Sequence, residues 1–328
     1  MSTDAPVVLQ GPGDPIDVAT VGGADVAARS PLQLFWMRFR RDRVASGALA
    51  FIALLIVVAI AAPLIISIAG TPGPNVQDSA ALDPTFGTPT GPASAHPLGV
   101  DGNGRDVFAR VLYGARVSLE VALFATLLSM LIGVAVGMIA GFYRGWVDGL
   151  LSRVIDVVLA FPILLLAVGI GSACSLGNGC LGGTIKPGVS VVILVIVVVN
   201  WTYIARIVRG QVLSLREKEF VEAARSLGAS NRRILMRDIL PNLVAPIMVY
   251  STLLIPQNIL LEAALSFLGV GVQPPNATWG AMIADAIATF DSAWWYMTFP
   301  GLALLLTVLA FNLLGDGMQD ALNPRATR

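Results

Sequence analysis

Six long apolar stretches without a charged residue constrain this chain more than any other feature of its sequence. An α-helix rises about 1.5 Å per residue, so about 20 apolar residues cross the ~30 Å hydrocarbon core of a bilayer. One charge at the bilayer centre costs about 2.5–3.5 kcal/mol, which is why spans of this length lack charges. We therefore predict an all-α polytopic membrane protein with six transmembrane helices. Five of the predicted spans cover residues 45–68, 121–142, 157–173, 187–205 and 294–315, and the other begins near Leu243 and stays uncharged up to Glu262.

The third and fourth predicted spans are the least distinctive, because a buried helix of a soluble protein can have the same length and apolarity. Prolines also interrupt several spans, and each removes one helical hydrogen bond. They lie inside or at the edge of the apolar stretches, at Pro162, Pro246, Pro256 and Pro300.

The composition excludes several classes of protein. Hydrophobic residues make up 55% of the chain and charged residues 13%, whereas soluble domains carry about 25% charged residues. A typical soluble enzyme and a basic nucleic-acid-binding protein are therefore excluded, and the expected surroundings are membrane lipid. One His and two Cys leave almost no material for a metal site or a His-based catalytic centre, so we expect no metal and no catalytic residue.

Lysine and arginine residues are unevenly distributed between the segments that join the predicted spans. If the N-terminus is cytoplasmic, the external segments hold four of the 21 Lys and Arg residues, namely Arg105, Arg110, Arg116 and Lys186. Cytoplasmic segments carry the excess of positive charge in membrane proteins, so both termini are predicted to be cytoplasmic. The predicted organisation is a disordered cytoplasmic tail (1–30), a basic pre-span segment (31–44), a six-helix domain (45–322) with an outer loop (70–120) and a cytoplasmic loop (206–242), and a C-terminal tail (323–328).

Four small residues in the second span are spaced four positions apart, at Ser129, Gly133, Gly137 and Gly141. On a helix they form a groove in which another helix can approach closely. The partner helix can belong to the same subunit or to a second subunit, and the sequence leaves both open.

Two cysteines, Cys174 and Cys180, lie in the predicted external loop between the third and fourth spans. An oxidising exterior permits a disulfide there, and two free thiols are the equal alternative. His96, the only histidine, lies in the outer loop, where a turn or interface role is favoured over a metal site.

Five polar residues lie within or beside the spans and are therefore expected to face protein or water rather than lipid. They are candidates for lining a translocation pathway, and interhelical hydrogen bonding is the more frequent alternative for the amides. They are Asn200, Gln257, Asn258, Glu262 and Asn312.

The loop between the fourth and fifth spans has the pattern of a helix–turn–helix elbow. Gly228 can end a first helix in a left-handed cap, and Ser230 or Asn231 can begin a second helix, which Pro241 closes. Such a basic amphipathic loop can dock on a soluble partner or lie on anionic lipid. The predicted apolar positions are Leu213, Phe220, Ala224 and Leu227 in the first helix and Leu235 and Ile239 in the second.

The motif in this loop resembles the EAA loop of permease subunits of bacterial ABC importers. The residues that carry the resemblance are Glu222-Ala223-Ala224, Gly228 and Ile239-Leu240-Pro241. The chain departs from the common form at Asp238, where that form has Ile.

Motifs outside the loop resemble the C-type subunit of dipeptide and oligopeptide permeases. They begin with His96-Pro97-Leu98-Gly99 and Gly104-Arg105-Asp106 in the outer loop, continue with Gly114-Ala115-Arg116-Val117-Ser118-Leu119 and Leu240-Pro241-Asn242, and end with Leu261-Glu262-Ala263-Ala264-Leu265-Ser266-Phe267-Leu268-Gly269. The resemblance covers residues 96–269, and the span pattern extends it to about residue 322.

The resemblance implies a type I ABC importer permease-like fold in a bacterial cell membrane and a role as a non-catalytic transport subunit. The implied partners are a homologous B-type permease, two cytoplasmic ATPase subunits, an external substrate-binding protein and a peptide substrate. ATP and Mg²⁺ would be held by the ATPases, since the chain has no Gly-rich phosphate loop. The residues expected to couple the spans to the ATPases are Glu222, Ala223, Ala224, Arg225 (as an ionic anchor), Gly228 and Pro241.

Other substrates and other classes of protein stay open at this point. Relatives of this type also carry nickel chelates, haem or glutathione-like compounds. A secondary transporter would need internal repeats and ionisable residues at mid-membrane, and a channel would need a repeated selectivity element; the sequence shows neither clearly.

Overall fold

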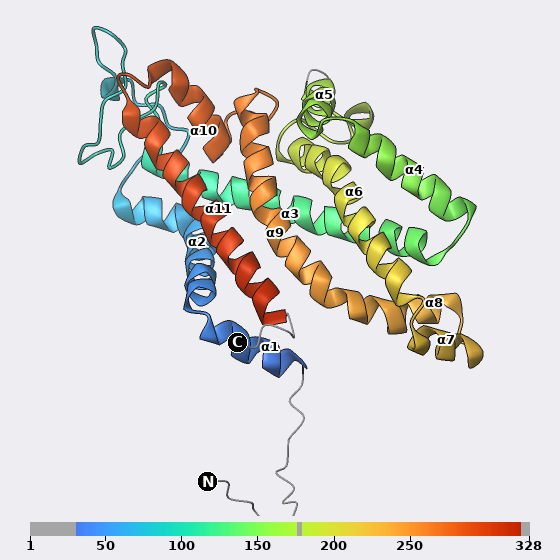
Figure 1. Cartoon of the computed structure of the whole chain (residues 1–328). Coiled ribbons are helices and arrows are strands. Elements are labelled where there is room, and N and C mark those ends of the chain that lie inside the picture. The colour runs from blue at the N-terminus through green and yellow to red at the C-terminus, as the bar shows by residue number, and fades with distance from the viewer. Residues whose placement is uncertain (1–30, 176–178, 323–328) are drawn as a thin grey trace, which may run out of the picture.

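The computed structural model describes residues 31–175 and 179–322, and within these two ranges the chain forms helices and loops without a β-strand (Figure 1). The predicted tails, residues 1–30 and 323–328, lie outside the described residues. In chain order the helices are α1 (Pro31–Arg41), α2 (Arg43–Ala69), α3 (Val107–Phe142), α4 (Trp146–Ala160), α5 (Ile163–Ser175), α6 (Val189–Leu215), α7 (Glu219–Ser226), α8 (Asn231–Arg233), α9 (Leu240–Phe267), α10 (Trp279–Ala286) and α11 (Trp294–Leu322). A π-helical turn, Ile234–Ile239, joins α8 to α9.

Five helices are long and apolar enough to cross a membrane: α2, α3, α6, α11 and the continuous α8–α9 segment. A sixth span is present if α4 and α5 are counted together, although these two helices are bent by 89°. The third predicted span, residues 157–173, is therefore not one straight helix. Pro162 explains the break, because proline lacks a backbone N–H and disfavours helical geometry at the residue before it. Phe161 is accordingly extended, with φ −84° and ψ 138°.

The second predicted span is part of a much longer helix. α3 contains 36 residues, or about 54 Å at about 1.5 Å per residue, and begins well before the apolar stretch at Val121. Asp106 starts this helix, because its side chain accepts a hydrogen bond of 2.7 Å from the backbone N–H of Ala109. The polar segment after the outer loop is thus continuous with the span.

The ends of α2 follow from local chemistry in the same way. Asp42 caps the start, where its Oδ1 accepts bonds from the N–H groups of Val44 (2.9 Å) and Ala45 (3.1 Å). Gly70 ends the helix at φ 66°, a left-handed conformation that glycine adopts without steric cost.

The small-residue stripe of α3 packs against α6 of the same subunit. The stripe consists of Ser129, Gly133, Gly137 and Gly141, all of which are buried. A Cβ atom added at Gly137 would lie 2.6 Å from the carbonyl oxygen of Ala205, so glycine is needed for the two backbones to approach. Of the two alternatives, the structure thus shows packing within the subunit.

The two loops with sequence motifs lie at opposite ends of the helix bundle (Figure 1). α1, α7 and α8 lie at one end, and α10 and the loop of residues 70–106 lie at the other. The basic segments of α1 and of the α7–α8 region therefore share one end of the bundle.

The α3–α6 seam gives a first prediction. Gly137→Ala should lower the stability of the purified protein by about 1–3 kcal/mol, because the added methyl group forces two packed helices apart. Gly149→Ala is the matched control, since a Cβ atom added there in α4 meets nothing within 4 Å. Thermal unfolding in detergent measures the difference, and equal melting temperatures for the two variants would contradict the seam.

Candidate functional site

The segment between α6 and α9 folds as an elbow of two short helices, and we call residues 216–239 the elbow. Gly228 turns the chain at φ 77°, and the N–H of Ala229 donates to the carbonyl oxygen of Ala224 at 3.0 Å. The left-handed cap predicted from the sequence is therefore present. Ser230 caps α8, as one of the two predicted alternatives, by accepting a bond of 3.4 Å from the N–H of Arg233.

The apolar side of the elbow packs against the ends of the spans. Val221 is buried in a cluster with Ile234, Leu235 and Ile239, and Ala224 lies at the edge of this cluster. The cluster also contains residues of α3 and α6, among them Phe142, Ile204, Val208 and Val212. The cluster includes Leu243 of α9 as well. Movement of the elbow would therefore act directly on α3, α6 and α9.

The predicted apolar face of the first elbow helix is partly wrong. Phe220 is 42% exposed and Leu227 is 87% exposed, whereas Val221 is fully buried. Leu213 belongs to α6, which continues to Leu215, and a turn separates it from α7. α7 is a separate helix that begins at Glu219. The spacing of apolar residues counted from Leu213 therefore does not predict which side of α7 is buried.

The face of the elbow that points away from the spans is exposed and carries apolar and acidic side chains. Exposed apolar residues are Phe220, Leu227 and Met236. The predicted coupling residues Glu222 and Ala223 are exposed beside them. An exposed apolar surface rimmed by charged residues is typical of a protein–protein interface.

Arginine residues hold the elbow to the end of α3. Arg216 donates from Nη1 to the carbonyl oxygens of Gly141 (2.8 Å) and Phe142 (3.2 Å), which lack partners within their own helix. Its Nε also bonds to Glu217 at 3.2 Å, and Glu217 forms an ion pair with Arg144. α3 and the elbow are therefore joined by direct polar contacts.

Arg225 also contacts the end of α3 within its own subunit. Its guanidinium carbon lies 5.7 Å from the centroid of the Phe142 ring, a cation–π arrangement. Sequence reasoning missed the roles of Arg216 and Phe142. The Arg216–Gly141 bond joins positions 75 residues apart, and no local pattern connects them.

Two of the predicted pathway residues are joined to each other inside the helix bundle. Asn200 in α6 donates to Asn258 in α9, which donates in turn to Thr126 of α3 at 2.8 Å. For these amides the structure shows the interhelical alternative.

Glu262 is also enclosed, with 0% exposure. Its carboxylate accepts bonds from the hydroxyl groups of Ser118 (3.1 Å) and Ser266 (2.8 Å). Gln257 and Asn312 are exposed, and Gln257 lines a cavity of about 410 Å³ with Asn200. These two side chains are therefore the pathway candidates that still point away from their own subunit.

Three further sequence-predicted features lie outside the elbow. Pro241 does not close the second elbow helix as predicted, because the helical segment continues from Asn231 to Phe267 and Pro241 lies in the first turn of α9, where proline is tolerated. His96 is buried, with Nδ1 2.9 Å from Asp106 and Nε2 3.6 Å from Asp78, so it fastens the outer loop to the start of α3. A disulfide joins Cys174 and Cys180 at the C-terminal end of α5. Within residues 31–175 and 179–322, no group of three or more His, Cys, Asp or Glu residues is placed to hold a metal ion.

Comparison with known proteins identifies sequence relatives over most of the chain. The profile of the binding-protein-dependent transport system inner membrane component matches residues 133–328, and that of the N-terminal TM domain of oligopeptide transport permease C matches residues 30–84. The glutathione transport system permease protein GsiD of Shigella flexneri is 46% identical over 297 residues, which cover 90% of this chain and 91% of that protein. GsiD of Escherichia coli is 44% identical with the same coverage.

A solved structure has a similar fold over about two thirds of this chain. Inward-facing MetNI methionine ABC transporter matches with a TM-score of 0.53 at 18% identity, over 65% of this chain and 96% of the matched chain. At this level of identity the match concerns the fold.

The cap at Gly228 gives a second prediction. Gly228→Val should loosen the elbow by about 1–2 kcal/mol or more, because a side chain is strained in the left-handed region. A Cβ atom there meets nothing within 4 Å, so strain rather than crowding is tested. Gly228→Asn is the control, because asparagine tolerates this conformation. Hydrogen exchange should quicken in residues 219–239 of the Val variant alone, and unchanged exchange would contradict the cap.

Proposed function

Because this chain belongs to the family of binding-protein-dependent transport system inner membrane components, we propose that it imports di- or oligopeptides as half of a translocation pathway. Family membership makes it a permease subunit of an ABC importer and a multi-pass protein of the bacterial inner membrane. The peptide class is supported by the match of residues 30–84 to oligopeptide transport permease C.

Glutathione is the second candidate substrate. The relatives named as glutathione transport permeases are 44–46% identical over 90% of this chain, and this observation favours a glutathione-like compound over haem or nickel chelates. Both candidates are small compounds with free carboxylates, so one pathway chemistry can serve either.

The exposed side of the elbow is the observation that carries the proposed mechanism. Phe220 and Leu227 project from a short helix whose other side, through Val221, packs on the ends of the spans. We expect an ATPase subunit to cover this surface, with Glu222 and Ala223 at the contact. ATP and Mg²⁺ would be bound by the ATPase, and this chain would contribute no catalytic residue.

The elbow would transmit the ATPase cycle through contacts already described. Val221 and Ile239 pack on the ends of α3, α6 and α9, and Arg216 ties the elbow to the carbonyl end of α3. Differential affinity of the ATPase for two elbow positions would then bias the spans between two states. A homologous B-type permease would complete the pathway, and an external binding protein would deliver the substrate.

The direction of transport follows if the elbow faces the cytoplasm. α1 and the end of α11 lie at the same end of the bundle as α7 and α8, so we place both ends of the described chain on the cytoplasmic side (Figure 1). A secondary transporter would have no use for a projecting docking surface, and the family assignment separates this chain from that class.

A third prediction tests the docking surface. Leu227→Asp should abolish co-purification of the ATPases and ATP-dependent uptake, because it places a charge at the centre of an apolar contact. Leu227 is 87% exposed, so the fold itself should tolerate the change. Val76→Asp is the control, since Val76 is an exposed apolar residue of the outer loop. The measurement is pull-down of the complex followed by uptake of labelled dipeptide or glutathione into proteoliposomes containing ATP. Retained ATPases and uptake in the Leu227→Asp variant would contradict the proposal.

A further inference from the structure

A polar cavity of about 550 Å³ lies at the end of the bundle opposite the elbow. Its walls come from the outer loop at Asn103 and Arg105, the start of α3, the segment that follows α9, and α10 and α11. This volume falls within the range of about 300–1,000 Å³ that is typical of small-molecule sites. Several spans thus meet around one space on the outer side.

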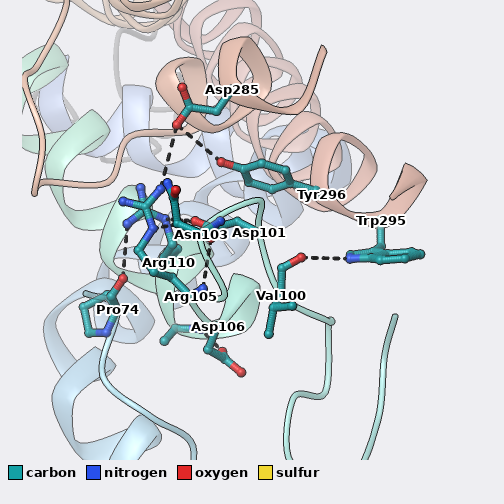
Figure 2. A network of polar contacts seen from close by, with 11 residues as sticks. Pro74, Val100, Asp101, Asn103, Arg105, Asp106, Arg110, Asp285, Trp295 and Tyr296 are labelled. Atoms are coloured by element: carbon teal, nitrogen blue, oxygen red, sulfur yellow. Dashed lines mark hydrogen bonds and ion pairs between the residues drawn. The ribbon is translucent and has the colours of Figure 1, made fainter. Parts of the chain in front are cut away.

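The base of the cavity contains two arginines and one buried carboxylate. Asp101 is fully buried and accepts a bond of 2.6 Å from Nε of Arg105, as Figure 2 shows. Arg110 is 2% exposed; its Nη1 donates to the carbonyl oxygen of Pro74 at 3.1 Å. Its Nε lies 3.4 Å from Asp101 and, among the described residues, makes no hydrogen bond. The two guanidinium groups therefore share one buried carboxylate, so the base of the cavity carries one more positive than negative charge.

A second carboxylate lies at the rim and is held only loosely. Asp285 of α10 is 4.0 Å from Nη2 of Arg105, and its side chain is 55% exposed. The hydroxyl of Tyr296 donates to it at 3.4 Å (Figure 2). The cavity thus presents positive charge at its base and a separate negative charge at its rim.

We propose that this cavity binds a small zwitterionic peptide, with its carboxylate on Arg105 and Arg110 and its ammonium group on Asp285. The inference rests on the proposed function and names the chemistry by which the outer side would receive the substrate. A guanidinium group suits a carboxylate, because two of its parallel N–H groups can donate to the two carboxylate oxygens, and a second guanidinium nearby adds a further positive charge. A zwitterion adds one charge of each sign, so the cluster stays balanced when it is filled.

Contacts of the cavity connect it to the moving helices. Arg110 belongs to α3, whose other end is tied to the elbow. Ser266 lines the cavity and donates to the buried Glu262 of α9. A peptide held here would therefore contact α3 and α9 before it enters the pathway.

The test uses the purified complex of both permeases and the ATPases in nanodiscs, without the binding protein. Isothermal titration calorimetry compares alanyl-alanine with its C-terminal amide and its N-acetyl form. We expect saturable binding of alanyl-alanine and an affinity lower by about tenfold or more for each blocked peptide, because each loses one charged contact. Absence of saturable binding of alanyl-alanine would overturn the inference.

Matched variants assign the two contacts. Asp285→Asn should remove the preference for a free amino group, and Asp291→Asn, an exposed acidic residue outside the cavity, should keep it. Arg105→Gln should remove the preference for a free carboxylate, and Arg116→Gln, an exposed residue of α3, should keep it. If Arg105→Gln fails to fold, the comparison of Asp285→Asn with Asp291→Asn alone tests the inference. Unchanged preferences in Asp285→Asn would overturn the inference.

Failure of the peptide site can be told apart from failure of the transport function. Uptake of alanyl-alanine by proteoliposomes with the binding protein and ATP, without binding by the complex alone, would overturn the inference and leave the proposed function intact. Absence of uptake of any peptide by the wild-type complex would overturn the proposed function. If Asp285→Asn weakens binding of the peptide-free binding protein and leaves peptide binding unchanged, the cavity is a protein-docking site and the inference is wrong.

Discussion

The close approach of α3 and α6 is the interaction on which the other features of this structure depend. Gly133, Gly137 and Gly141 let the backbone of α3 lie against α6, where a single added Cβ atom would meet α6 within 2.6–2.7 Å. In a bilayer, packing of this kind replaces the hydrophobic effect as the force that joins helices. The two helices therefore form one stiff unit, to which both functional regions are attached.

This unit holds the two functional regions at its two ends. Asp106 and Arg110 place the start of α3 in the outer polar network, and Phe142 places its end against the elbow. α6 leads directly into the elbow through Arg216. A displacement of the elbow thus acts on the same helix that contributes Arg110 to the outer cavity. This arrangement gives the elbow and the outer cavity a common mechanical support.

Most of the polar side chains described within the spans form hydrogen bonds between helices of the same subunit. Asn200, Asn258 and Thr126 bond to one another across three helices, and both oxygens of Glu262 accept hydroxyl groups. An unpaired polar group in hydrocarbon costs several kcal/mol, for the same reason that charges are excluded from spans. These residues therefore hold α3, α6 and α9 in register, whereas Gln257 and Asn312 stay exposed on the surface of the subunit.

The sequence by itself determined the class of protein and the local geometry. Apolar length predicts spans whatever their partners, and the cap at Gly228 depends only on residues nearby. It also located the elbow, because the EAA resemblance is a local motif. Two predictions from the sequence were wrong because a local pattern was extended too far. One was the straight span across Pro162, and the other was the apolar helix face counted from Leu213.

The tertiary structure alone decided which surfaces are covered. The glycine stripe of α3 could have faced any helix, and it packs on α6 because the two helices fit there. Arg216 and Gly141, 75 residues apart, meet only in the fold, as do Arg105 and Asp285 at the outer cavity. Helix caps and the length of an apolar stretch depend on residues that are close together in the chain. Packing depends on which helices lie side by side, and no local sequence pattern determines this.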